Sequence, residues 1–268
     1  MLRSVSGPSS LSFSATVPVL DANVGIGHRP HRPSPVDSPA QLVDEMARHG
    51  VARALVHHQM GETLSAVTAN ELLPQWCEGN PALLPQWMAS AEPDSLKQLQ
   101  AVHADGAIAS VRLHDCAATG ERFSEWLYGD LLAWLQQERI ALWLSIAEDW
   151  DRTWMSRVDG TPADEMLTTL GSYPELRVVI VGAHYSHWAA VRPLLDRLPR
   201  CVLELSRYEV LGDVERLVAT YGAGRFIYGS FYPRFAMGPI LFYLHHLGLA
   251  EADLAQICAA GAGELLSR

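Results

Sequence analysis

Short apolar runs and helix-like segments alternate eight times along this 268-residue chain, and few folds accommodate that order. The apolar runs, each of which predicts a strand, are residues 16–26, 51–58, 82–90, 107–114, 140–148, 176–184, 201–208 and 225–233. Strands that alternate with helices form parallel βαβ units, and eight units in roughly 250 residues match a (β/α)8 TIM barrel, an α/β fold. An open doubly wound sheet is the alternative, but no GxGxxG turn follows the first run.

The charge balance limits the class of partner. The formal net charge is −10, which argues against nucleic acid, and no apolar run reaches the ~18 residues of a membrane span. The chain has a single lysine, Lys97, within a predicted amphipathic helix. Schiff-base chemistry and a carboxylated-lysine metal bridge would both need that residue. We therefore expect no nucleic-acid partner, no membrane span and no lysine chemistry.

The cysteines and the first residues predict the compartment and the domain limits. The four cysteines are far apart and form no CxxC pair, so we read them as reduced thiols in a cytoplasmic protein. Residues 1–16 are rich in serine and lack the apolar stretch of a signal peptide. We expect 1–16 to be a disordered leader and 17–268 to be a single barrel domain.

Histidine and arginine side chains gather where the predicted strands end, which is the active-site face of a barrel. Imidazole transfers protons near neutral pH, so His114 and His184 are the candidate catalytic residues. Arg112 shares a strand face with His114 and is placed to grip a substrate carboxylate, although a buried ion pair with Glu204 or Glu148 explains it equally well. The further candidates for substrate binding are Asn23, His28, His31, Ser206 and Tyr232, with Arg234 beside them.

Several motifs resemble the amidohydrolase superfamily, specifically its decarboxylase and lactonase-type branch. VLDANVGIG resembles the D-x-H-x-H opening, ASVRLH the G-x-R-L strand, and YPELRVVIVGAHYSHW the P-x-L-x-x-V-x-x-H-x-G strand. LELSRY, followed by LVATYGAGRFIYGSFYP, resembles the serine-bearing seventh strand and the run that ends in G-S-D-x-P. The resemblance covers residues 17 to 266 and implies a barrel that acts by hydrolysis, lactone opening or decarboxylation of a small carboxylated or cyclic substrate.

The metal ligands of that family are missing from the matching positions. Metal-binding members use two histidines of strand one, histidines of strands five and six, and the aspartate of G-S-D. The matching residues here are Asn23, Gly25, Ser145, Gly182 and Phe231. Because glycine and phenylalanine offer no donor atom, we expect no metal at the usual site.

Three hypotheses follow from these departures. The first is a metal-independent, amidohydrolase-like enzyme. The second is a catalytically silent barrel that partners an active, metal-dependent paralogue. The third is a metalloenzyme with ligands relocated to His28, His31, His114 and His184. An aromatic-rich segment such as EWLYGDLLAWL fits a homodimer face as well as it fits the barrel core, so a homodimer is one open expectation.

Overall fold

The computed structural model describes residues 13–29, 33–106, 108–114, 122–146 and 163–267. His31, Cys116 and the first twelve residues of the predicted leader lie outside this part of the chain. The remaining leader residues, 13–16, lie against helix α11 (Gly238–His245), where the Phe13 ring is 5.5 Å from that of Phe242.

Parallel strands form the centre of the molecule, and every predicted strand position is occupied. The strands are β1 (Leu20–Ile26), β2 (Arg53–His58), β3 (Leu83–Pro85), β4 (Trp87–Ala89), β5 (Ser110–Leu113), β6 (Ala141–Ser145), β7 (Val178–Val181), β8 (Cys201–Glu204) and β9 (Phe226–Ile227). The third predicted strand is divided at Gln86 into β3 and β4. Each strand pairs with its sequence neighbour in parallel, in the orders β1-β2-β3 and β4 to β9.

Hydrogen bonds bridge the two places where the regular ladder is interrupted. The Gln86 amide donates to the Val56 carbonyl (2.8 Å) between β3 and β4. On the other side, Ala22 N donates to Tyr228 O (3.1 Å) and Gly25 N donates to Tyr232 O (2.6 Å), which joins the segment after β9 to β1. These contacts complete the ring of a (β/α)8 barrel.

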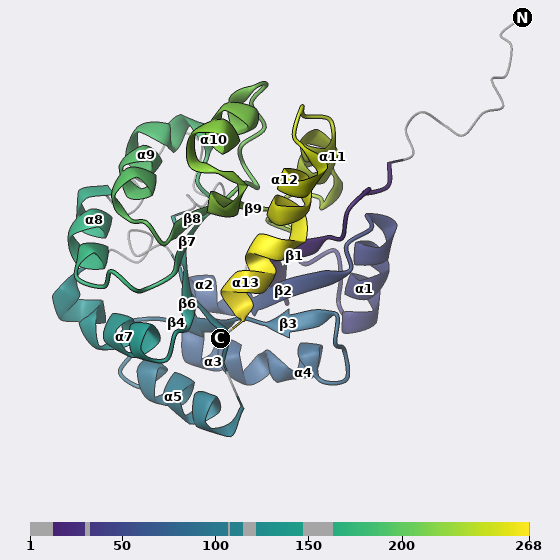
Figure 1. Ribbon diagram of the computed structural model, residues 1–268. Helices are drawn as coiled ribbons and strands as arrows, with labels where there is room; N and C mark the ends of the chain where they lie inside the picture. Colours follow the sequence, from purple (N-terminus) through teal and green to yellow (C-terminus); the bar gives the residue numbers. More distant parts are fainter. Residues whose placement is uncertain (1–12, 30–32, 107, 115–121, 147–162, 268) are drawn as a thin grey trace, which may run out of the picture.

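Helices surround the strands, as Figure 1 shows. They are α1 (Pro39–Arg48), α2 (Met60–Thr63), α3 (Ala66–Leu72), α4 (Pro74–Cys77), α5 (Ser95–Asp105), α7 (Glu125–Gln137), α8 (Ala163–Gly171), α9 (Trp188–Arg197), α10 (Asp213–Tyr221), α12 (Glu251–Ala255) and α13 (Gly261–Leu266), besides α11. The described residues also form two short 3-10 turns, η1 (Tyr185–His187) and η2 (Ala223–Arg225), and a π-helical turn, η3 (Gln256–Ala260). None of the described helices is long and apolar enough to cross a membrane.

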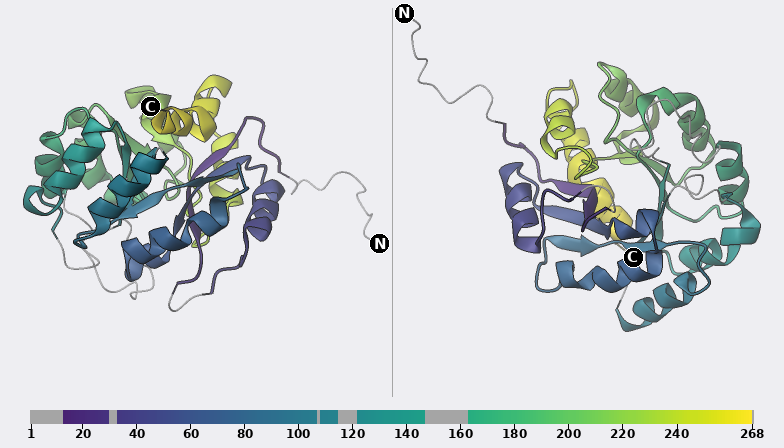
Figure 2. Two further views of the ribbon diagram at one scale, coloured as in Figure 1. Left: turned by 90° about the horizontal axis from the view of Figure 1, so that it is seen from below. Right: turned by 180° about the vertical axis from the view of Figure 1, so that it is seen from behind.

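The core has two layers. A large cluster fills the space between the strands and the outer helices, and a smaller one fills the barrel interior around Trp143, Val179 and Leu55. Ala262 and Leu265 of α13 belong to the interior cluster, so this helix closes the end of the barrel where the strands begin. In the view from below, the C-terminal helices lie at one end of the strands (Figure 2). The opposite end, where the strands finish, is therefore the mouth of the barrel.

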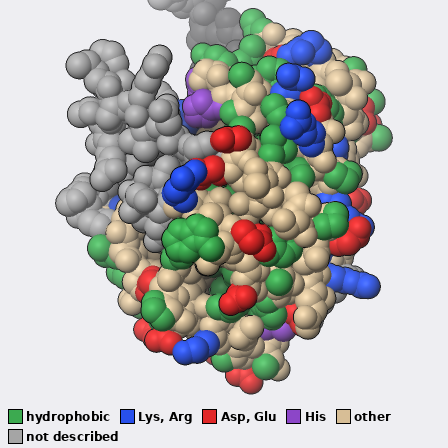
Figure 3. Space-filling view, turned by 90° about the vertical axis from the view of Figure 1, so that its left-hand side faces the viewer, with side chains coloured by type: hydrophobic (Ala, Val, Ile, Leu, Met, Phe, Trp, Pro, Cys, Tyr) green, Lys and Arg blue, Asp and Glu red, His purple; other side chains and the backbone are tan. Residues whose placement is uncertain are grey.

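The surface that carries α7 and α8 shows hydrophobic side chains scattered among acidic and basic ones (Figure 3). Trp126 is 79% exposed, whereas Tyr128, Leu131 and Leu135 of the same helix are buried in the core. The aromatic-rich segment singled out from the sequence thus belongs mainly to the barrel's own packing.

Candidate active site at the mouth of the barrel

An irregularity in β1 decides which residues of the first strand point into the barrel. Leu20 and Ala22 belong to the interior cluster, whereas Val24 and Ile26 belong to the outer one. The pairing register with β2 shifts between Asp21 and Val24. A shift of this kind reverses the alternation of inward and outward side chains. The two successive residues Ala22 and Asn23 therefore both face the interior.

Arg112 of β5 is the central cation of the mouth. Its side chain is fully buried, with Nε donating to Gln86 Oε1 and Nη2 donating to Asn23 Oδ1, both at 2.7 Å. Among the described residues, Nη1 has no hydrogen-bond partner. Burial lowers the pKa of Arg112 to about 10, so the guanidinium remains charged at neutral pH. One edge of a fixed, desolvated cation is thus left available for a ligand.

Glu204, at the end of β8, organises the opposite wall. Its carboxylate accepts hydrogen bonds from Asn23 Nδ2 (3.1 Å), Ser206 Oγ (2.9 Å), Ser206 N (2.6 Å) and Gly182 N (3.3 Å). Complete burial raises the pKa of Glu204, an effect that these donors and Arg112 oppose. Asn23 stands between Arg112 and Glu204 and contacts both, so two of the predicted substrate-binding residues, Asn23 and Ser206, hold Glu204 in place.

A second cluster lies around Glu62 of α2, which is 5% exposed. Its carboxylate accepts from His57 Nε2 (2.9 Å) and Arg234 Nη2 (2.7 Å), and Arg29 Nη2 lies 3.5 Å away. Burial raises the pKa of Glu62, but Arg234 and the hydrogen bond from His57 outweigh it and hold that pKa well below the usual range. Glu62 is therefore an ionised carboxylate in the interior.

The two histidines of this cluster are neutral. Burial and the nearby arginines lower the pKa of His57 to about 3 and that of His114 to about 4. Since an ionised carboxylate can only accept, the proton of neutral His57 resides on Nε2. His114 lies within electrostatic range of Glu62 and Arg234, which places this predicted catalytic residue in the same cluster as Arg112.

Three other sequence candidates are held elsewhere. His28 is largely exposed and its ring contacts Ser34 N (2.9 Å) and Asp37 Oδ1 (3.5 Å). The Tyr232 side chain is buried in the outer cluster. Burial, and after it the charge of Glu45 of α1, raises the pKa of Tyr232 to about 12. His184 caps the turn η1, with Nδ1 2.7 Å from Ser186 Oγ. Burial and Arg207 lower the pKa of His184 to about 4, and its catalytic role stays a prediction.

Sequence reasoning missed Glu62 and Gln86 as parts of the site, and it placed His57 at the active-site face without assigning it a role. Glu62 lies in a four-residue helix with no periodic pattern, and its partners are separated from it by up to 172 residues. The one available signal was position, because His57 lies near the end of the predicted strand 51–58 and Arg234 directly follows the predicted strand 225–233. Of the two carboxylates considered as ion-pair partners of Arg112, Glu148 lies outside the described residues. Among the described residues, Arg112 donates to two amides, Gln86 and Asn23, and not to Glu204.

The residues at the usual metal positions do not fit a divalent ion. A side chain at Gly25 would meet Gln59, whose Cγ lies 2.8 Å from the position of an added Cβ, so Gln59 fills that space. Asn23 Oδ1 already accepts from the Arg112 guanidinium. Phe231 packs its ring under Arg234, 4.6 Å from the guanidinium carbon. No group of three or more His, Cys, Asp or Glu in the described residues is arranged to hold a metal.

Comparison with known proteins supports the fold. No protein-family model matches the sequence, and no curated protein matches it. Among solved structures, a dihydroxybenzoic acid decarboxylase from Polaromonas sp. JS666, with bound manganese and the inhibitor 2-nitroresorcinol, superposes with a TM-score of 0.73 at 13% identity, over 93% of this chain and 97% of that one.

Two further structures are similar. A putative amidohydrolase from Staphylococcus aureus has a TM-score of 0.69 at 12% identity, over 95% of this chain and 99% of that one. An uncharacterised TIM-barrel protein from Bordetella bronchiseptica has a TM-score of 0.69 at 16% identity, over 93% of this chain and 98% of that one. The chain thus has the (β/α)8 fold of solved amidohydrolases and decarboxylases, and the resemblance inferred from its motifs is confirmed at the level of fold.

Proposed function

We propose that the mouth of this barrel binds a small carboxylated substrate between Arg112 and Arg234, and that the protein is a hydrolase or lyase that needs no divalent metal. One observation carries the proposal. Each of these two guanidinium groups has a buried Nη1 without a hydrogen-bond partner among the described residues. A buried N–H without a partner costs free energy, and a carboxylate has two oxygens that accept one donor from each arginine.

The charge of the cluster supports an anionic ligand. Arg29, Arg112 and Arg234 carry three positive charges, and Glu62 supplies one negative charge. Glu204 reduces the total further when it is ionised, which leaves a net charge between about +1 and +2 from these five groups. In a desolvated site this excess favours a substrate that brings its own negative charge.

The individual residues then have separate tasks. Arg112 and Arg234 bind and orient the carboxylate, while Glu62 fixes Arg234 and is itself held by His57. Asn23 and Ser206 position Glu204 on the facing wall. The neutral His114 is the group of this cluster that we assign to proton transfer. The similar structures include decarboxylases and a hydratase, so hydrolysis, lactone opening and decarboxylation are the reactions to test.

The residues that stand at the ligand positions support the proposal of metal independence. Arg112 donates from its guanidinium to Asn23 Oδ1, and Gln59 fills the space beside Gly25. A fixed guanidinium cation therefore lies beside the first of these positions, and an amide side chain fills the space at the second. A guanidinium stabilises developing negative charge on an oxygen by electrostatics alone. No step of the proposed chemistry therefore passes through a metal ion.

The test is a binding and turnover screen of the full chain with small carboxylates, including hydroxybenzoates and short dicarboxylates. The matched amides serve as uncharged controls. We expect binding of the acids but not of the amides, and a loss of at least about tenfold in affinity for Arg112→Gln and for Arg234→Gln. The control Lys97→Gln, at an exposed residue, leaves affinity unchanged. Equal binding of acids and amides contradicts the proposal, as does activity that chelation abolishes and a divalent metal restores.

The silent-subunit hypothesis is retained as a second candidate, because Gly25 and Phe231 are changes that an inactive barrel tolerates. It predicts a stable heteromer with a relative that carries both strand-one histidines, detected by native mass spectrometry of the protein purified from its source. A homodimer and a cytoplasmic location likewise stay predictions. Turnover by the isolated chain would reject the silent-subunit hypothesis.

A further inference from the structure

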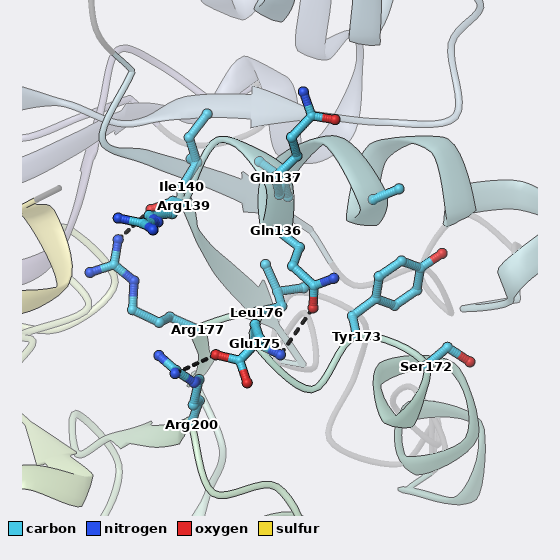
Figure 4. A pocket seen from close by; sticks show the side chains of 12 residues that line it. Gln136, Gln137, Arg139, Ile140, Ser172, Tyr173, Glu175, Leu176, Arg177 and Arg200 are labelled. Carbon is cyan, nitrogen blue, oxygen red and sulfur yellow. Dashed lines mark hydrogen bonds and ion pairs between the residues drawn. The ribbon is translucent and has the colours of Figure 1, made fainter.

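The end of the barrel opposite the mouth contains a second basic site. A cavity of about 660 Å³ lies there, next to the residues that precede β6, β7 and β8. Three arginines line it: Arg139 after α7, Arg177 before β7 and Arg200 before β8. Figure 4 shows their side chains on one side of the cavity, with Tyr173 on the other. The volume is within the range of small-molecule sites.

The positive charges at this cavity exceed the negative ones. Of the charged side chains that line it, only Glu175 is acidic, and it pairs with Arg200. The Arg139 side chain makes no hydrogen bond or ion pair with any residue that the structure describes. Burial is the main cause that lowers the pKa of Arg177, and the neighbouring charges of Arg200 and Arg139 lower it further. The local net charge of +2 contrasts with −10 for the whole chain.

The three arginines do not have the same role. Arg177 donates Nη1 to the carbonyls of Glu264 (3.1 Å) and Ser267 (3.0 Å), and Nη2 to that of Arg139. It therefore fixes the end of α13 to the turn after α7. Arg200 uses one nitrogen for Glu175 and keeps its other donors. Arg139 and Arg200 are thus the cations available to a ligand, whereas Arg177 is also structural.

The backbone at Arg139 is an unusual place for an arginine. Helix α7 ends in a Schellman pattern, in which Ile140 N donates to Leu135 O (2.9 Å) and Arg139 N donates to Gln136 O (3.2 Å). Arg139 has φ of 57°, a conformation in which glycine is favoured. The chain tolerates this strain at the position that brings a third guanidinium to the cavity.

From this arrangement we infer that the cavity is a binding site for a small phosphorylated molecule, separate from the barrel mouth. A phosphate monoester carries between about −1.5 and −2 charges at pH 7, which matches the local excess of two positive charges. A single carboxylate would neutralise only half of it. Arginine pairs with phosphate oxygens through two parallel N–H donors. Tyr173, Ile140 and Leu176 line the rest of the cavity and provide contact for an organic group.

The experiment is calorimetric titration of the full chain with inorganic phosphate and with glycerol phosphate, at constant ionic strength, with glycerol as the uncharged control. We expect both phosphates to bind and glycerol not to bind. Arg139→Gly and Arg200→Gln each weaken phosphate binding at least about tenfold. The control Arg48→Gln, which removes an exposed arginine of α1, leaves it unchanged.

The choice of glycine makes the test independent of misfolding. Because glycine suits a positive φ, the ligand-free Arg139→Gly protein is expected to unfold within about 2 °C of the wild type, or higher. Arg112→Gln, at the barrel mouth, is expected to keep phosphate binding intact. The inference is overturned when phosphate does not bind, when Arg139→Gly binds as tightly as the wild type, or when Arg112→Gln abolishes binding.

Discussion

Replacing Glu62 by glutamine removes the one ionised carboxylate at the centre of the Arg29, Arg234 and His57 cluster while keeping its shape. The side chain is 2% exposed and both oxygens are hydrogen-bonded. Removing one partner of a buried ion pair costs about 3–5 kcal/mol, since the other charge remains buried. Glutamine still accepts from Arg234, so we expect the lower end, about 3 kcal/mol. For a chain of this size, that lowers Tm by about 6–12 °C.

Urea unfolding at pH 7, followed by circular dichroism, measures this difference in the free energy of unfolding. The pKa of Glu62 is depressed in the folded state, so its stabilising contribution is present above the unfolded pKa of about 4.3 and is lost as pH falls through the lower folded value. The gap between wild type and Glu62→Gln is therefore constant from pH 8 to 5 and narrows in stronger acid. The control Glu71→Gln, at an exposed residue of α3, should change stability by less than about 0.5 kcal/mol.

A difference below about 1 kcal/mol at pH 7 refutes the reasoning, because it means that the arginines do not depend on Glu62 for compensation. The same holds for a gap that widens as pH falls from 7 to 5, which is the wrong sign for a carboxylate of depressed pKa. Either result means that Glu62 can no longer be counted as the ionised carboxylate of the cluster, so the charge balance of the cluster would have to be drawn without it.

Two more predictions concern stability. Gly25→Ala places a Cβ 2.8 Å from Gln59 Cγ and should lower the free energy of unfolding in urea by about 1–3 kcal/mol. The double variant Gly25→Ala/Gln59→Ala should recover much of that loss. If the effects of the two substitutions are simply additive, Gln59 does not fill the second ligand position. The folded pKa of His57 is about 3, so between pH 6.5 and 3 the unfolded chain binds a proton that the folded protein does not, and stability falls as pH falls. The glutamine of His57→Gln can still donate to Glu62 but does not titrate. Between pH 7 and 5, the free energy of unfolding of this variant should therefore fall by about 2 kcal/mol less than that of the wild type. An equal fall in both proteins would contradict the neutral, buried state of His57.

The sequence by itself determined the architecture. Local periodicity and the order of strands and helices depend on residues close in the chain, so eight βα units and a barrel could be predicted from the pattern. The absence of donor atoms at Gly25 and Phe231 was equally visible, because it follows from residue type alone. So was the shared strand face of Arg112 and His114, which follows from the alternation of side chains along a strand.

Only the tertiary structure decided what the site contains. The register shift in β1 turned Asn23 inward against the alternation set by Leu20 and Ala22, and a shift of this kind leaves no local signature in the sequence. Arg112, Glu62 and Arg234 meet because parallel strands bring their carboxyl ends to one face, although β5 and the loops that follow β2 and β9 are far apart in the chain. The opposite end of the barrel gathers Arg139, Arg177 and Arg200 by the same geometry, from the turns that precede three neighbouring strands. Charged residues that are far apart in the sequence come close together only because the ring of strands closes.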